Sequence, residues 1–222
     1  MKRVLSFALS LVMLMSITGG LGLTAYAGDT YYETEDNDDY SSADYVPVNS
    51  TIYGVCREYD SDWYKFTLSS SAKVNVQFSF NRADADGDWD VYLYKYDGNG
   101  DYTQLEYKDV YVYDGSYTFS SLGLPAGTYF VKVYGYNSAC GRQYSITPKC
   151  SYVSNWETEF NDEYTSADPL SMGVTRYGVC RGYDRDWYKF VLNAPSTVSL
   201  ELQTLPLVIY GLIKSIYLKS LT

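Results

Sequence analysis

The chain has 222 residues, 46% of them apolar, and its mean hydropathy of −0.26 excludes both a polytopic membrane protein and a fully disordered chain. Its 27 acidic and 17 basic residues give a formal charge of −10, which argues against nucleic acid and anionic membranes as partners. The sequence contains no histidine, which excludes Ser-His-Asp and Cys-His catalysis and histidine-ligated zinc.

The first 27 residues are typical of a secretory signal peptide. Lys2 and Arg3 form a positive start, residues 4–17 are mostly apolar but short for a membrane span, and residues 25–27 form a small-x-small cleavage site. The alternative is an N-terminal anchor helix. We expect a mature chain that begins near Gly28 and is secreted to the extracellular space.

An acidic segment with the sequence ETEDND follows at residues 33–38. Alternate residues of an extended segment point the same way, so its side chains can converge, and two more aspartates precede the next strand. Oxygen ligands of this kind suit Ca²⁺, which takes about six to eight of them. The candidate ligands here are Glu33, Glu35, Asn37, Asp38, Asp60 and Asp62. The alternative is a solvated acidic turn with two strand-capping aspartates.

After this segment the apolar pattern has a period of two, as in Val74, Val76 and Phe78. Glycine-containing turn signals separate the alternating stretches. We expect strands near residues 53–56, 63–69, 73–80, 90–96, 103–108, 116–119, 128–136 and 143–147. Many short strands at regular spacing predict an all-β fold, a jelly-roll-like antiparallel β-sandwich of about eight strands.

Tyrosine is unusually frequent, with 27 copies in the chain. Strands favour tyrosine, and alternation turns every second side chain outward. A candidate ligand surface is formed by Tyr92, Tyr94, Tyr96, Tyr134 and Tyr136. The alternative is that most of these rings pack in or over the core.

Four cysteines fit an exported protein, and none of them forms a CxxC pair, which argues against a thiolate zinc site or a redox motif. Three disulfide pairings are possible. We favour Cys56–Cys140, because both fall in the first domain, and then Cys150–Cys180. Free buried thiols are the alternative.

The chain contains an internal repeat. Residues 33–68 reappear without a gap as residues 157–192, so that Glu157 lies 124 residues after Glu33. The second copy repeats the candidate ligands as Glu157, Glu159, Asn161, Asp162, Asp184 and Asp186. These side chains are kept although Asp36 becomes Phe160 and Ser61 becomes Arg185, and this favours the ligand interpretation.

A period of this length is that of a whole domain. We therefore divide the chain into a β-sandwich at 29–149, a linker at 150–156 and a partial second repeat at 157–204. The apolar tail at 205–222 diverges from the first copy. A C-terminal membrane segment is disfavoured there by two lysines.

The repeated segments, together with GDWDVYLYKYDGNG, LPAGTYFVKVYGY and QYSITP, resemble the bacterial pre-peptidase C-terminal domain family. They are also similar to the collagen-binding modules of clostridial collagenases. The resemblance implies a secreted, non-catalytic jelly-roll module, often appended to an extracellular peptidase. In calcium-binding members the acidic segment and an aspartate before the DxDWY-type strand hold the ions, which points to the same carboxylates in both copies.

We therefore expect a secreted calcium-binding module that attaches to an extracellular protein fibre or polysaccharide, or that accompanies a peptidase domain. An enzyme is not expected, because no catalytic constellation is present in the sequence. The alternatives are a carbohydrate-binding module with an aromatic platform and a purely structural spacer repeat.

Overall fold

The computed structural model describes residues 29–57, 60–81, 88–111, 113–136, 139–182 and 184–203. The predicted signal peptide and the apolar tail lie outside the described residues. Among the residues described, no helix has the length and apolar character needed to cross a membrane.

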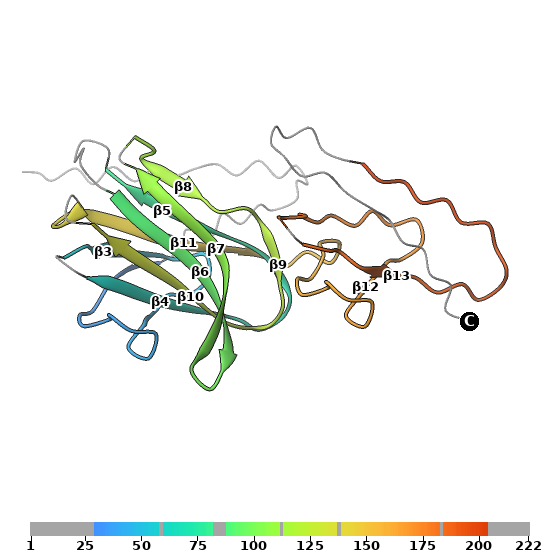
Figure 1. Ribbon diagram of the computed structural model, residues 1–222, viewed down its shortest axis with the longest axis horizontal. Coiled ribbons are helices and arrows are strands. Elements are labelled where there is room, and N and C mark those ends of the chain that lie inside the picture. Colours follow the sequence, from blue (N-terminus) through green and yellow to red (C-terminus); the bar gives the residue numbers. More distant parts are fainter. Residues whose placement is uncertain are drawn as a thin grey trace, which may run out of the picture.

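Two β-sheets lie face to face in a sandwich (Figure 1). The strands of one sheet are β1 (Thr30–Tyr32), β3 (Thr51–Val55), β5 (Ala72–Phe80), β8 (Ser116–Thr118), β9 (Leu122–Leu124) and β11 (Gln143–Ser151). Those of the other are β2 (Asp44–Tyr45), β4 (Ser61–Leu68), β6 (Asp88–Gly98), β7 (Asp101–Tyr111) and β10 (Gly127–Gly135). The strand orders are β1-β3-β11-β5-β8, with β9 also paired to β5, and β2-β4-β10-β6-β7.

The core lies between the two sheets because each long strand alternates. In β5 the buried Val74, Val76 and Phe78 face the core, while the residues between them are half-buried on the other face. The all-β sandwich predicted from this period is confirmed. Pairing is antiparallel except at two edges, where β1 runs parallel to β3 and β2 parallel to β4.

Every segment predicted as a strand overlaps a strand of the structure. The pattern does not predict β1, β2 and β9, since two or three residues are too few to show a period. The last strand, β11, continues to Ser151 and so enters the predicted linker.

The described part of the second copy contains two short paired strands, β12 (Asp168–Pro169) and β13 (Tyr188–Lys189), and a parallel bridge between Trp156 and Tyr177. These pairings repeat β2 with β4 and β1 with β3 of the first copy. The second copy therefore reproduces the edges of the sandwich around its acidic segment.

The predicted disulfides are not formed, and all four cysteines are free thiols. Cys56 is buried and its Sγ donates to the carbonyl of Arg57 (3.5 Å), whereas Cys140 is exposed in the neighbouring turn. Cys150 lies near the end of β11 in the sandwich, and Cys180 lies exposed in the second copy. Burial raises the pKa of the Cys56 thiol to about 12, so this group stays protonated.

Candidate cation site

Glu33 starts the site directly after β1. Its amide donates to the carbonyl of Tyr53 (2.9 Å), which continues the pairing with β3. One carboxylate oxygen accepts from the amide of Val55 (2.6 Å) and the other from the hydroxyl of Tyr64 on β4 (2.5 Å). The carboxylate therefore bridges both sheets, and burial raises its pKa.

Gly54 makes room for this carboxylate. A Cβ at this position would clash with Glu33 Oε2 and the Tyr64 hydroxyl and would lie 2.6 Å from the ring of Tyr144. The glycine of the repeated YGVC sequence is thus a steric requirement of the site. Sequence reasoning did not single it out, although its return as Gly178 was a signal.

A chain of hydrogen bonds leads from Glu33 into the core. The hydroxyls of Tyr64 and Tyr144 lie 2.6 Å apart, and Tyr144 donates to Asp62 Oδ2. Three contacts in this chain need three protons, and two hydroxyls supply only two. One carboxyl group carries the third proton and then donates to its tyrosine instead of accepting from it, in agreement with burial that raises the pKa of Asp62 to about 9.

Glu35, Asp38 and Asp60 form the mouth of the site, with ligand atoms that lie within 4.8 Å of one another. Arg57 Nε is 3.0 Å from Glu35 Oε1 and supplies one compensating charge. A hydrogen bond with Asp60 raises the pKa of Asp38, and burial raises that of Glu35. Carboxylates held this close repel each other unless protons or a cation neutralise them.

Asn37 lies beneath this mouth and is fully buried. Its carbonyl accepts from the amide of Trp63 (2.9 Å), and its Nδ2 donates to Asp44 (3.4 Å). Its Oδ1 and the Oδ1 of Asp62 are buried and have no hydrogen-bond partner in the described structure. Unsatisfied buried oxygens are costly, and a hard cation would satisfy them. All six ligands predicted in this copy thus lie around one corner of the sandwich.

The second copy repeats these bonds. Glu157 accepts from the amide of Val179 (2.5 Å) and the hydroxyl of Tyr188 (2.7 Å), and the carbonyl of Asn161 accepts from Trp187 (3.0 Å). Each bond matches one of the first copy. Burial raises the pKa of Glu159 to about 7.

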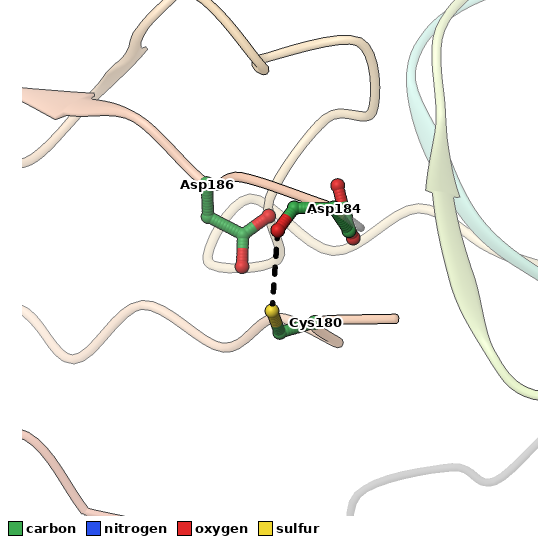
Figure 2. Close-up of side chains that lie close together, drawn as sticks. All are labelled: Cys180, Asp184 and Asp186. Atoms are coloured by element: carbon green, nitrogen blue, oxygen red, sulfur yellow. Dashed lines mark hydrogen bonds between the residues drawn. The ribbon is translucent and has the colours of Figure 1, made fainter. Parts of the chain in front are cut away.

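The acidic cluster of the second copy is composed differently. Cys180, Asp184 and Asp186 bring ligand atoms within 4.8 Å of one another, and the thiol donates to the carbonyl of Asp184 (3.6 Å) (Figure 2). Burial raises the pKa of Asp186 to about 8. Asp162 is exposed and accepts from the amide of Arg185 (3.3 Å). Four buried polar atoms of this copy have no hydrogen-bond partner in the described structure. They are Glu159 Oε1, Asp186 Oδ1 and both polar side-chain atoms of Asn161.

Known proteins provide a comparison with this arrangement. Residues 60–135 match the family model of the bacterial pre-peptidase C-terminal domain. The resemblance inferred from the sequence is thereby confirmed for this part of the chain. Pre-peptidase C-terminal domains are generally non-catalytic accessory modules associated with secreted bacterial peptidases.

Two solved structures are similar to the chain. The pre-peptidase C-terminal domain of a Bacillus anthracis collagenase is 20% identical, with a TM-score of 0.37, and the match covers 48% of this chain and 94% of that one. A mitogen from Yersinia pseudotuberculosis is 13% identical, with a TM-score of 0.35, and the match covers 50% of this chain and 92% of that one. No curated protein matches the chain significantly.

The predicted tyrosine surface lies on the outer face of the β2-β4-β10-β6-β7 sheet, opposite the core. Tyr92 and Tyr94 stack (5.7 Å between centroids), and Tyr94 stacks on Trp63 (5.6 Å). Tyr134 meets Tyr136 edge to face (5.2 Å). The rings pack on one another to such a degree that Trp63 is only 5% exposed.

The sequence did not single out several partners of these rings. Tyr40 covers both Trp63 and Phe130, and Tyr102 packs on Trp63 and Tyr94. Of the predicted surface, only Tyr136 remains clearly exposed, at 45%. It is joined by other exposed tyrosines that belong to β7, namely Tyr102, Tyr107 and Tyr111.

Proposed function

We propose that the chain is a secreted, calcium-stabilised attachment module, in which each copy of the acidic segment binds one cation. The observation that carries this proposal is the carboxylate cluster of Glu35, Asp38 and Asp60, with two carboxylates gathered again at Asp184 and Asp186 beside Cys180, and buried oxygens in both copies that lack hydrogen-bond partners. Glu33, Glu35, Asn37, Asp38, Asp60 and Asp62 would hold the first ion. Carboxylate and amide oxygens are the ligands that Ca²⁺ prefers.

The cation would stabilise the corner where β1, β3, β4 and β11 meet. Extracellular modules bind Ca²⁺ with dissociation constants of roughly 10⁻⁴ to 10⁻³ M. At about 1 mM free ion and the tighter limit, linkage adds about 1.4 kcal/mol to the free energy of unfolding. In a domain of this size such an increase raises Tm by a few degrees.

Thermal unfolding with 5 mM calcium (about fivefold above the weaker limit) and then with chelator tests the cation site. We expect calcium to raise Tm in the wild type and Glu35→Gln to abolish most of the rise. Asp101→Asn is the matched control, because this aspartate is exposed in the β6–β7 hairpin. An unchanged wild-type Tm, together with no binding in calorimetry, would contradict the site.

Attachment would use the outer aromatic face, where Tyr102, Tyr107, Tyr111 and Tyr136 are exposed. Tyrosine rings offer large contact area at low conformational cost and a polar hydroxyl. Pull-down on collagen, cellulose, mucin and starch identifies the polymer class. We expect Tyr107→Ala and Tyr136→Ala to weaken retention, and Tyr32→Ala, an exposed tyrosine on the other sheet, to leave it unchanged. Retention on none of the polymers would favour the structural spacer.

A further inference from the structure

The second copy contacts the sandwich through its own acidic segment. The backbone amide of Glu159 donates to the carbonyl of Gly123 on β9 (2.6 Å). Figure 1 shows β9 at the boundary between the sandwich and the second copy. The second copy thus adds a backbone hydrogen bond to the edge of a sheet.

The lack of a side chain at Gly123 leaves room for this backbone contact. The three atoms nearest to a Cβ built on Gly123 belong to Trp156 and Glu157, and this Cβ would clash with the carbonyl oxygen of Glu157. No side chain fits between β9 and that backbone. The glycine therefore permits close approach of two chain segments rather than an unusual backbone turn.

Arg181 makes a second contact, at a β-bulge. The pairing of β6 with β7 slips so that Leu93 faces Glu106 and Tyr94 faces Gln104, which leaves Leu105 opposite no partner. Arg181 Nη1 donates to the carbonyl of Leu105 (2.8 Å) and to Glu106 Oε1 (3.0 Å). The bulge thus presents a carbonyl beside a carboxylate, the pair of acceptors that a guanidinium group can reach together.

Two lysines of the sandwich cover aromatic rings of the second copy. Lys73 Nζ lies 4.0 Å from the ring centroid of Trp156, and Lys95 Nζ lies 5.1 Å from that of Phe160. Phe160 occupies the position of Asp36 in the first copy. The substitution thus supplies the aromatic ring that Lys95 contacts.

The same positions of the first copy are more exposed in the described structure. Arg57, the counterpart of Arg181, has a side chain that is 63% exposed, whereas that of Arg181 is 29% exposed. Tyr32, the counterpart of Trp156, is 71% exposed. Equivalent residues are therefore half-buried in the second copy and mostly exposed in the first, because in the described part of the chain the second copy lies against the sandwich.

We infer that β9, the β7 bulge, Lys73 and Lys95 form a docking surface whose partner is the acidic segment of the following repeat. This surface holds successive repeats head to tail in a fixed orientation, rather than as independent units on a flexible linker. Arg181 also lies 3.6 Å from Glu159, so the docking surface adjoins the second acidic cluster. The docking contacts are formed by protein groups alone, so the inference does not depend on cation binding.

Hydrogen exchange of the full chain, measured in the presence of chelator, tests the docking surface. We expect the amide of Glu159 to be protected in the wild type, and Gly123→Ala to remove that protection. Arg181→Glu should lower it about tenfold, as expected for loss of charged hydrogen bonds, and Glu106→Arg in the same chain should restore part of it. Lys149→Glu, a charge reversal at an exposed position of β11, is the matched control and should have no effect.

Exchange of β5 and β11 amides in the same samples reports whether each variant remains folded. Loss of protection at Glu159 with those strands still protected supports docking. An unprotected Glu159 amide in the wild type would overturn it. So would a folded Gly123→Ala variant that keeps the wild-type protection.

Discussion

The two copies of the acidic segment make the same local hydrogen bonds in different surroundings. In the first copy, Tyr144 arrives from β11 and joins Asp62 to Tyr64 in the core. The described part of the second copy contains no counterpart of that strand, and its Asp184 and Asp186 are only half-buried. The repeated segment, residues 33–68 and 157–192, thus contains every partner of the bonds around Glu33 and Glu157, whereas a distant strand is needed to bury the site.

Replacing the two repeated glycines, Gly54 and Gly178, should reveal the largest difference in stability between the two copies. Gly54→Ala places a methyl group against two tyrosines and a carboxylate inside the sandwich, whereas Gly178→Ala meets only the carboxylate of Glu157, which can move aside. We expect Gly54→Ala to lower the free energy of unfolding by about 3 kcal/mol and Gly178→Ala by less than about 1 kcal/mol. Urea unfolding measures both, and equal costs would contradict the comparison.

Removal of the Tyr144 hydroxyl should have the next largest effect. Tyr144→Phe leaves Asp62 buried without its hydrogen-bond partner, at a cost of about 1–3 kcal/mol. Tyr188→Phe removes a hydroxyl from the second copy only, and should leave unfolding of the sandwich almost unchanged. Urea unfolding of both variants, monitored by near-ultraviolet circular dichroism, measures how much each hydroxyl contributes to the free energy of unfolding. A Tyr144→Phe protein as stable as the wild type would exclude the proposed proton-sharing chain.

The pH dependence of stability should differ between the copies. Burial raises the pKa of Asp62 to about 9, above its value of about 3.9 in an unfolded chain, so the folded state binds the proton more tightly. The stability that this group contributes is present in full below the unfolded pKa and is lost as pH rises through about 9. Without calcium, Tm of the wild type should therefore fall from pH 5 to pH 9 relative to Asp62→Asn. Asp186→Asn should retain the wild-type slope, because Asp186 lies outside the sandwich.

Calcium should produce the smallest difference. If each copy binds its own ion, Asp60→Asn removes the calcium-induced rise in the Tm of the sandwich, and Asp184→Asn leaves it in place. The expected rise is a few degrees. Calorimetric titration of the same variants checks whether each substitution removes one of two binding events. Loss of both events in Asp184→Asn would mean that the copies share a single site.

Much of the fold and part of the site could be predicted because they depend on local patterns. Period-two alternation located the long strands, and the repeat identified the acids that gather around Glu33 and Glu157. The hydrogen-bond chain through Tyr144 could not be predicted, since Tyr144 follows Asp62 by 82 residues in a chain rich in tyrosine. The predicted disulfides were wrong for a related reason, because the choice rested on shared domain membership and not on the directions of side chains.

The sequence by itself determined the all-β class, the duplicated acidic segment and the residues able to supply oxygen ligands. These properties follow from residue type and from spacing along an extended chain. Only the tertiary structure decided which carboxylates are buried, which tyrosines remain exposed and which copy meets a neighbour. Each of those outcomes depends on the order and register of strands far apart in the chain, as when the β7 bulge turns the carbonyl of Leu105 toward Arg181.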